Sequence, residues 1–332
     1  MNFTTGFICS QESLQYFDIV ILIFFSIFGS FGNSLILLSM IVFTRMRQSM
    51  NIFIGSISLA DMIICGYIMP WTTYYRSKCL TDVNSITCTI NGFLFFVCAG
   101  IANFNFMFIA INRRYFILNK MRYNKLFTNW KIIIYSCIIW TIWFGFGLIL
   151  NFFNSFHYIP NSFTCFYWDD YSPILASVIF TVFGVAVPSL VATCCYVTIF
   201  YNMIVIKRKI TQSISINKTA NENIQHNSWM NKEMRSILSA LVTFIIFNSC
   251  WTPYCVHVYI DKYQGPINPI VHKIITWMAM INSSMSPIIH GALHSKFRVS
   301  MLKLLTWKCN TIQKFKVSSE NNEKQIKIQK NC

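Results

Sequence analysis

Seven long apolar stretches, separated by polar segments, constrain the fold of this chain more than any other feature. Each is near or above the roughly 20 residues that a helix needs to cross a bilayer. They lie near residues 17–43, 52–75, 90–118, 132–153, 172–206, 237–259 and 267–293. Membrane-spanning strands would be about 10 residues long with alternating polarity. The pattern therefore predicts an all-α membrane protein, a seven-transmembrane helix bundle.

Composition and charge placement predict a multi-pass protein of the plasma membrane. Only 11% of the residues are charged, whereas soluble domains average about 25%, so lipid must solvate much of the surface. The loops after the first, third and fifth stretches and the C-terminal tail hold every lysine and arginine except Arg76, Lys78, Lys262 and Lys273. Because basic loops stay in the cytoplasm, we expect the N-terminus outside. The net charge of +16 indicates attraction to anionic membrane lipids rather than nucleic acid, since the basic residues flank the spans.

The polar segments divide the chain into regions. We expect residues 1–16 to form a short extracellular tail and residues 17–293 to form the helical bundle. Within the bundle, residues 207–232 read as a mobile cytoplasmic loop rich in Asn, Ser and Gln. Residues 294–308 are predicted to form an amphipathic helix on the membrane surface, and residues 309–332 a disordered cytoplasmic tail.

Two residues outside the apolar stretches are candidates for covalent modification. Asn2 opens an Asn-Phe-Thr glycosylation sequon on the predicted outer side. Cys309 follows the amphipathic segment at the depth where palmitoylation occurs, although a free cytosolic thiol fits the same position.

Four cysteines lie outside the apolar stretches on the predicted outer side and allow two disulfides. Cys88 at the outer end of the third stretch and Cys165 between the fourth and fifth are the best pair, which would tie that loop over the bundle mouth. Cys9 and Cys79 form a weaker second pair, and either of these two cysteines could instead be free.

A series of short motifs occurs along the apolar stretches. They are Gly32-Asn33, Leu59-Ala60-Asp61, Cys88, Asn112-Arg113-Arg114, Trp140, Pro188 with Tyr196, Phe247 with Cys250-Trp251-Thr252-Pro253, and Ser286-Pro287-Ile288-Ile289-His290. The set resembles the rhodopsin-like (class A) G-protein-coupled receptors from residue 32 to residue 297. The resemblance implies a receptor, not an enzyme, that binds an extracellular ligand within its bundle and activates a heterotrimeric G protein by shifting a conformational equilibrium.

Two further segments resemble the melatonin-receptor-like subgroup. These are Ile109-Ala110-Ile111-Asn112-Arg113 and Tyr123-Asn124-Lys125-Leu126-Phe127-Thr128-Asn129. The pocket signature of that subgroup is missing, however. Gly184 stands where those receptors have a histidine in the fifth span, and Asp169 where they have a glutamine in the loop.

The resemblance implies a conformational switch that runs through the third, fifth, sixth and seventh spans. Its residues here are Asn112, Arg113, Arg114, Glu233, Tyr196, Phe247, Trp251, Pro253, Pro287 and His290. An Arg113–Glu233 ion pair would hold the third and sixth spans together in the resting state, the alternative being a solvated surface pair of little energy. Pro253 and Pro287 should kink their helices. Arg114 and His290 replace family tyrosines.

Asp61 is an ionisable residue at mid-membrane depth, where an unpaired charge is costly. Asn33, Asn282 and Ser283 are its expected partners, and the resemblance implies a sodium ion among them. A neutral, hydrogen-bonded Asp61 is the alternative. We expect no other cofactor.

The ligand pocket implied by the resemblance is apolar and aromatic. Its predicted lining is Phe95, Ala99, Phe180, Thr181, Trp251, Tyr254, Cys255, Thr276 and Met280. Phe95 replaces the aspartate with which aminergic receptors bind monoamines, and Met280 replaces the lysine of opsins, so monoamines and retinal are disfavoured. A small molecule or a peptide is expected.

The acidic residues and the histidines near the outer face can each be interpreted in two ways. Acidic residues such as Asp18 and Asp170 could attract a cationic ligand or a basic peptide, or could simply be solvated. His257 and His272 lie near the outer ends of the sixth and seventh spans. Polar packing is the favoured interpretation there, and no metal site is predicted.

Two other functions remain open at this point. A receptor-fold protein that scavenges ligand or signals through arrestin, without a G protein, would explain the departures at Arg114 and His290. A transporter would be expected to carry inverted repeats and several mid-membrane charges, whereas only Asp61 is clearly mid-span.

Overall fold

The computed structural model describes residues 12–46, 49–80, 83–167, 178–217, 220–264 and 268–306. The predictions for Asn2, Cys9, Asp169 and residues 309–332, which include Cys309, lie outside these ranges.

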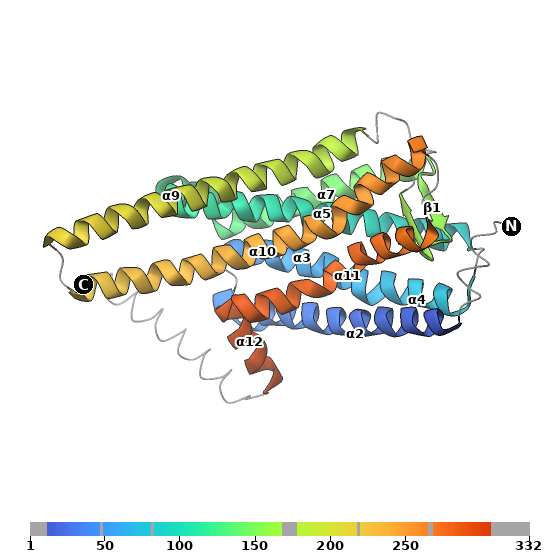
Figure 1. Cartoon of the computed structure of the whole chain (residues 1–332), viewed down its shortest axis with the longest axis horizontal. Helices are drawn as coiled ribbons and strands as arrows, with labels where there is room; N and C mark the ends of the chain where they lie inside the picture. The colour runs from blue at the N-terminus through green and yellow to red at the C-terminus, as the bar shows by residue number, and fades with distance from the viewer. Residues whose placement is uncertain are drawn as a thin grey trace.

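The chain folds into a bundle of seven long helical segments, as the apolar stretches predicted (Figure 1). The second segment is interrupted by the π-helical turn η2, and the fifth begins with the π-helical turn η4. In chain order the segments are α2 (Glu12–Val42), α3–η2–α4 (Ser49–Ile63, Ile64–Ile68, Met69–Ser77), α5 (Ser85–Leu118), α7 (Asn129–Phe152), η4–α9 (Phe180–Ala186, Val187–Asn217), α10 (Ala220–Gln264) and α11 (Pro269–Leu293). A short helix, α6 (Lys120–Leu126), connects α5 to α7, and α12 (Ser295–Leu305) follows the last span as predicted.

Six of these segments are apolar and long enough to cross a membrane by length and composition alone. The seventh, α11, is more polar because it turns hydroxyl and amide side chains toward the bundle, where Thr276, Ser283, Ser284 and Ser286 are buried. Polar side chains inside a membrane are expected on such inward faces. Large apolar side chains lie on the outside of the bundle instead. Ile142 and Leu148 of α7, for example, are exposed where lipid would cover them.

A β-hairpin closes one end of the bundle, and α12 lies at the other (Figure 1). We call these the hairpin end and the α12 end. Strand β1 (Phe156–Ile159) pairs antiparallel with β2 (Thr164–Tyr167). The predicted Cys88–Cys165 disulfide is confirmed, with Cα atoms 5.3 Å apart, and it joins β2 to the first turn of α5. Cys79 is also disulfide-bonded.

The predicted loop over residues 207–232 is largely helical and is corrected here. Helix α9 continues to Asn217 and α10 starts at Ala220, so both extend beyond the other helices at the α12 end (Figure 1). The segment contains no glycine and no proline, the two residues that most disfavour helix. The polar residues of this segment therefore indicate where the apolar span ends, whereas the helices continue beyond that point.

Helices α2 and α11 approach closely at the first sequence motif. A Cβ atom at Gly32 would lie 2.5 Å from the Cβ atom of Pro287, so only glycine permits this contact. Next to it, the side-chain amide of Asn33 donates to the backbone carbonyls of Gly29 and Ser283, each at 3.0 Å. The Gly-Asn motif thus joins the first helix to the last.

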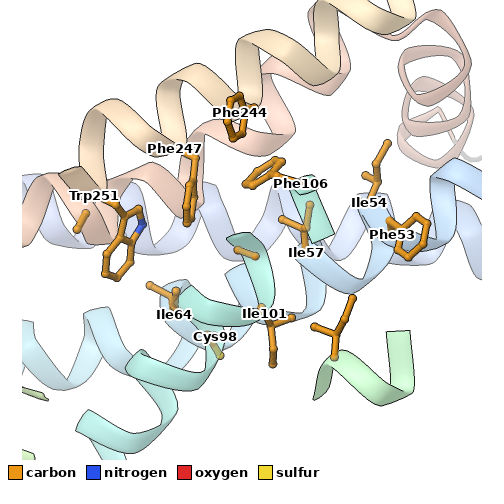
Figure 2. Close-up of a cluster of buried hydrophobic side chains, with 14 of the residues drawn as sticks. Phe53, Ile54, Ile57, Ile64, Cys98, Ile101, Phe106, Phe244, Phe247 and Trp251 are labelled. Carbon is orange, nitrogen blue, oxygen red and sulfur yellow. The ribbon is translucent and has the colours of Figure 1, made fainter. Parts of the chain in front are cut away.

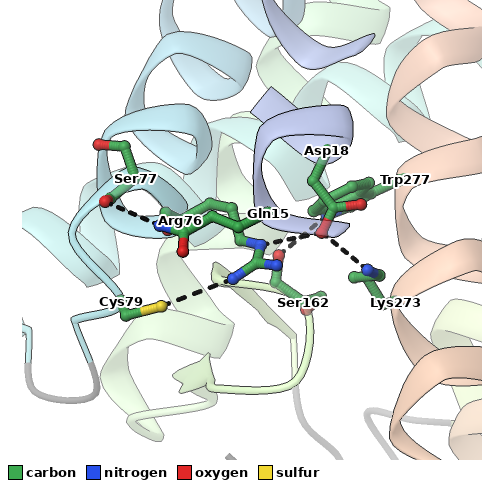
Figure 3. Close-up of polar contacts among 8 residues, drawn as sticks. All are labelled: Gln15, Asp18, Arg76, Ser77, Cys79, Ser162, Lys273 and Trp277. Atoms are coloured by element: carbon green, nitrogen blue, oxygen red, sulfur yellow. Dashed lines mark hydrogen bonds and ion pairs between the residues drawn. The ribbon is translucent and has the colours of Figure 1, made fainter. Parts of the chain in front are cut away.

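A buried ion cluster joins three helices at the hairpin end (Figure 3). One carboxylate oxygen of Asp18 on α2 accepts from Arg76 Nε at 2.9 Å and from Lys273 Nζ at 2.8 Å. The Arg76 side chain is fully buried and its guanidinium lies over the Phe163 ring of the hairpin turn. The interpretation of Asp18 as a solvated surface charge is therefore wrong. Sequence alone gave no sign that residues from α2, α4 and α11 share one site.

The ion cluster predicts that Asp18→Asn destabilises the bundle. Removing one partner of a buried ion pair costs about 3–5 kcal/mol because a charge remains buried without compensation, and here the carboxylate serves two cations. We expect a lower midpoint of thermal unfolding of the purified protein in detergent. Gln15→Ala is the control, because Gln15 donates to the nearby carbonyls of Arg76 and Ser77 but carries no charge. Equal midpoints for the two variants would contradict this role of Asp18.

Candidate functional site

A cavity lies inside the bundle between α5, η4 and α10, and Phe166 of strand β2 forms part of its wall. Aromatic rings and small side chains dominate the lining. The lining residues are Phe96, Ala99, Gly100, Asn103, Phe166, Phe180, Gly184, Val185, Phe247, Asn248, Trp251, Thr252 and Cys255. A lining of this composition is typical of small-molecule sites.

Part of the predicted pocket lines this cavity. Ala99, Phe180, Trp251 and Cys255 do so. The other predicted members, listed here, are not among the lining residues: Phe95, Thr181, Tyr254, Thr276 and Met280.

The predicted residues outside the lining have other neighbours. The Phe95 and Tyr254 rings pack against Phe166, with centroids 4.6 and 4.9 Å away. They therefore contact a residue of the cavity wall without lining the cavity themselves. Thr276 donates to the His272 carbonyl at 2.9 Å, and the Met280 sulfur accepts from Thr72 at 4.0 Å. The cavity therefore lies toward α5 and η4 rather than toward α11.

Trp143 of α7 fills space beside the cavity. A Cβ atom at Gly100 would lie 2.2 Å from the indole ring, and one at Gly184 would lie 2.9 Å from it. The two glycines thus provide the room for a tryptophan that is 2% exposed. At Gly184, where melatonin receptors were expected to carry a histidine, a larger side chain would collide with Trp143.

Two asparagines bring polar groups to the cavity, and the sequence analysis missed both. Asn103 donates to the carbonyl of Gly184 at 2.9 Å, one of the carbonyls along the π-helical turn η4. Asn248 accepts from the Ser189 hydroxyl at 2.9 Å and donates to the Phe244 carbonyl at 2.9 Å. The available signal was helical spacing, because Asn103 lies one turn beyond Ala99 on the same face of α5.

A series of aromatic rings leads from the cavity toward the α12 end (Figure 2). The centroids of Trp251 and Phe247 are 5.9 Å apart, and those of Phe247 and Phe106 are 5.1 Å apart. Phe106 lies 6.4 Å from Phe244, which lies 5.8 Å from Tyr196. These separations fall in the range of favourable ring contacts. The predicted switch residues Trp251, Phe247 and Tyr196 therefore belong to one packed row.

Arg113 joins α5 to α10 near the α12 end. Its guanidinium donates to the hydroxyl of Ser236 on α10, and the residue is only 8% exposed. Asn112 beside it is buried. The side chain of Glu233 lies outside the described residues, so the predicted ion pair stays a prediction. Ser236 is a contact that the sequence analysis did not foresee.

Other switch positions also lie near the α12 end. Arg114 is exposed and lies beside the Cys195 thiol of α9. His290 is buried, with Nδ1 3.5 Å from the Ser239 hydroxyl of α10 and its ring 5.7 Å from that of Phe297 on α12. The imidazole thus joins α10, α11 and α12 where the family has a tyrosine. Pro253 and Pro287 both lie inside their helices, as predicted.

Asp61 lies buried among hydroxyl groups. The Ser286 hydroxyl donates to its carboxylate at 2.8 Å, and Ser283 provides a second side-chain hydrogen bond. Asn282, which precedes Ser283 on α11, is also buried. Asn33 instead makes the backbone contacts described above.

Comparison with known proteins supports the family indicated by these motifs. The family model described as "7 transmembrane receptor (rhodopsin family)" matches residues 32–290. Melatonin receptor type 1C of Gallus gallus is 28% identical over 280 residues, which cover 82% of this chain and 77% of that receptor. Melatonin receptor type 1B of Homo sapiens is 25% identical over 283 residues, which cover 82% of this chain and 74% of that receptor.

The fold is also similar to the crystal structure of squid rhodopsin. The TM-score is 0.76 at 18% sequence identity, and the match covers 93% of this chain and 92% of that chain. The matched family consists of receptors rather than enzymes, and its members bind ligands and couple to G proteins. This chain therefore belongs to the rhodopsin family of G-protein-coupled receptors, and within that family it is similar to the melatonin receptors.

Proposed function

We propose that this receptor binds a small, neutral, largely apolar molecule in the cavity beside Trp251 and so activates a heterotrimeric G protein. The observation that carries the proposal is the position of Trp251, which lines the cavity and begins the aromatic row toward the α12 end. A ligand that changes the packing of Trp251 would favour one arrangement of α10 over another. A cavity lined by aromatic rings and small side chains between the helices fits a small molecule better than a peptide.

The orientation of the receptor in the membrane is part of this proposal. The basic loops support an N-terminus outside the cell, so the hairpin end would face the ligand and the α12 end the G protein. Plasma-membrane location, glycosylation at Asn2, palmitoylation at Cys309 and contact of α12 with membrane lipids complete this topology. Arrestin is a further proposed partner at the α12 end.

The relatives are named as melatonin receptors, yet the cavity argues for a different ligand here. Gly184 leaves no imidazole in the cavity, and Trp143 occupies the space beside it. A ligand that depends on that imidazole would lose its polar contact. We therefore propose an aromatic or aliphatic ligand positioned mainly by shape, and melatonin belongs in the test panel as a comparison.

A sodium ion beside Asp61 is also proposed, because the available groups are oxygen donors. They are the Asp61 carboxylate, the Ser283 and Ser286 hydroxyls, and the buried Oδ1 atom of Asn33, which has no hydrogen-bond partner among the described residues. Asn282 is the remaining candidate. The ion would supply positive charge to balance the carboxylate in a region without solvent.

The first test is ligand-driven nucleotide exchange. The purified receptor in nanodiscs, screened against indoles, fatty acids, amines and peptides, should accelerate loading of a GTP analogue onto at least one Gα class. Ala99→Phe should abolish the response to the active compound, because the added ring would fill the cavity. Leu190→Phe is the control, since Leu190 on α9 is exposed on the outside of the bundle and does not line the cavity.

Three results would count against the proposal. If both phenylalanine variants respond equally, the cavity is not the binding site. If no Gα class is ever loaded, coupling fails, and signalling through arrestin would then become the better account. Ligand-driven ion flux in liposomes would revive the transporter alternative, which the family match does not favour.

The second test concerns the contact between α5 and α10. Ser236→Ala should raise basal nucleotide exchange several-fold, because hydrogen bonds to charged groups contribute about 1.5–3 kcal/mol and this bond joins the two helices. Glu233→Ala should act in the same direction if the predicted ion pair also forms.

The control for this test is Ser136→Ala, which removes a buried hydroxyl on α7 that makes no described hydrogen bond. Basal exchange should be compared at equal amounts of receptor. An unchanged basal rate in both the Ser236 and Glu233 variants would remove Arg113 from the resting contact.

A further inference from the structure

Two buried histidines meet between α10 and α11 at the hairpin end. The ring centroids of His257 and His272 are 4.5 Å apart, with the ring planes at 84°, and each residue is 2% exposed. His272 lies in the first turn of α11, and His257 lies within two turns of the end of α10. The pair is therefore close to the aqueous mouth of the bundle while its rings are shielded.

We propose that His257 and His272 form a binding site for a borderline divalent cation, with Zn²⁺ as the representative ion. This site is separate from the cavity beside Trp251, whose lining contains neither histidine. It would join α10 to α11 through a metal ion.

The spacing of the rings fits two ligands of one ion. Zinc–nitrogen bonds are about 2.0–2.1 Å long, and two imidazoles at a tetrahedral angle on one ion would have ring centroids about 5 Å apart. The observed 4.5 Å lies close to that value. Binding one ion would then require the two side chains to rotate so that one nitrogen of each ring points at it.

Thr276 fixes which nitrogen of His272 can bind a metal. The Thr276 hydroxyl donates its proton to the His272 carbonyl at 2.9 Å, and its oxygen lies 3.5 Å from His272 Nδ1. Since that proton is committed, the oxygen can only accept from Nδ1, which therefore carries the ring proton. The lone pair of His272 then lies on Nε2. Such outer hydrogen bonds commonly orient metal-binding histidines.

The charges around the pair do not oppose a cation strongly. Lys273, the next residue along α11, is bound to the carboxylate of Asp18 at 2.8 Å. No cluster of three or more histidine, cysteine or acidic side chains that could hold a metal occurs within the described ranges. The protein would thus supply two nitrogens, and water or chloride would complete the coordination, which implies weaker binding than in a structural zinc site with four protein ligands.

The test adds ZnCl₂ to the full-length receptor in detergent and follows thermal unfolding. Micromolar Zn²⁺ should raise the unfolding midpoint of the wild type, and His257→Phe and His272→Phe should each abolish that increase while keeping an aromatic ring in place. His294→Ala is the control, because His294 directly precedes α12 at the opposite end of the bundle, and it should leave the increase intact.

A second measurement separates metal binding from ring packing. One equivalent of CoCl₂ should give visible d–d absorption bands in the wild type and not in the phenylalanine variants. His272→Cys keeps a metal ligand and should retain the zinc effect. Thr276→Val should weaken zinc binding about 10- to 100-fold, the usual effect of removing an orienting hydrogen bond. This variant keeps both histidines, so it also serves if the phenylalanine variants do not fold.

Three results would overturn the site. They are an absent zinc effect in the wild type, an equal effect in wild type and both phenylalanine variants, and loss of the effect in His294→Ala. None of these depends on nucleotide exchange, so the site and the proposed signalling function can fail separately.

Discussion

Lipid offers no hydrogen-bond partners, and this constraint organises the polar residues of the receptor. A polar side chain at membrane depth is therefore stabilised by a partner inside the bundle. Helix α11 provides several of these partners: Ser286 binds Asp61, the Ser283 carbonyl accepts from Asn33, and Ser284 donates to the Phe25 carbonyl at 2.8 Å. The last helix is therefore the least apolar span because it completes the hydrogen bonds of the first two.

The two ends of the bundle are held by different chemistry. At the hairpin end, a disulfide joins β2 to α5, and a buried ion cluster joins α2, α4 and α11. At the α12 end, single hydrogen bonds such as Arg113 to Ser236 join α10 to its neighbours. The covalent bond and the buried charges together resist rearrangement, whereas a single hydrogen bond, even one from a charged guanidinium, contributes only about 1.5–3 kcal/mol. The difference fits the proposed function, in which the hairpin end faces the ligand and the α12 end moves.

Sequence alone predicted the helix count, the disulfide at Cys88 and the helix after the last span, because hydropathy and motif order carry that information. It failed where the outcome depends on contacts between distant segments. The spacing of α5 was known, yet placing Asn103 in the cavity requires knowing that η4 presents the Gly184 carbonyl. Asp18 looked like a surface charge because its two partners come from other helices. The loop over 207–232 was misassigned because polarity was taken as a sign of disorder.

The packing of Trp143 into Gly100 and Gly184 makes three positions on three helical segments interdependent. A side chain larger than hydrogen at Gly100 or Gly184 requires a smaller one at 143, and loss of the indole would leave a void that neither glycine can fill. Among relatives of this receptor, these positions should therefore have changed together or not at all. The space available to a ligand beside Gly184 therefore depends on all three residues, and a larger residue at 184 would first need a smaller one at 143.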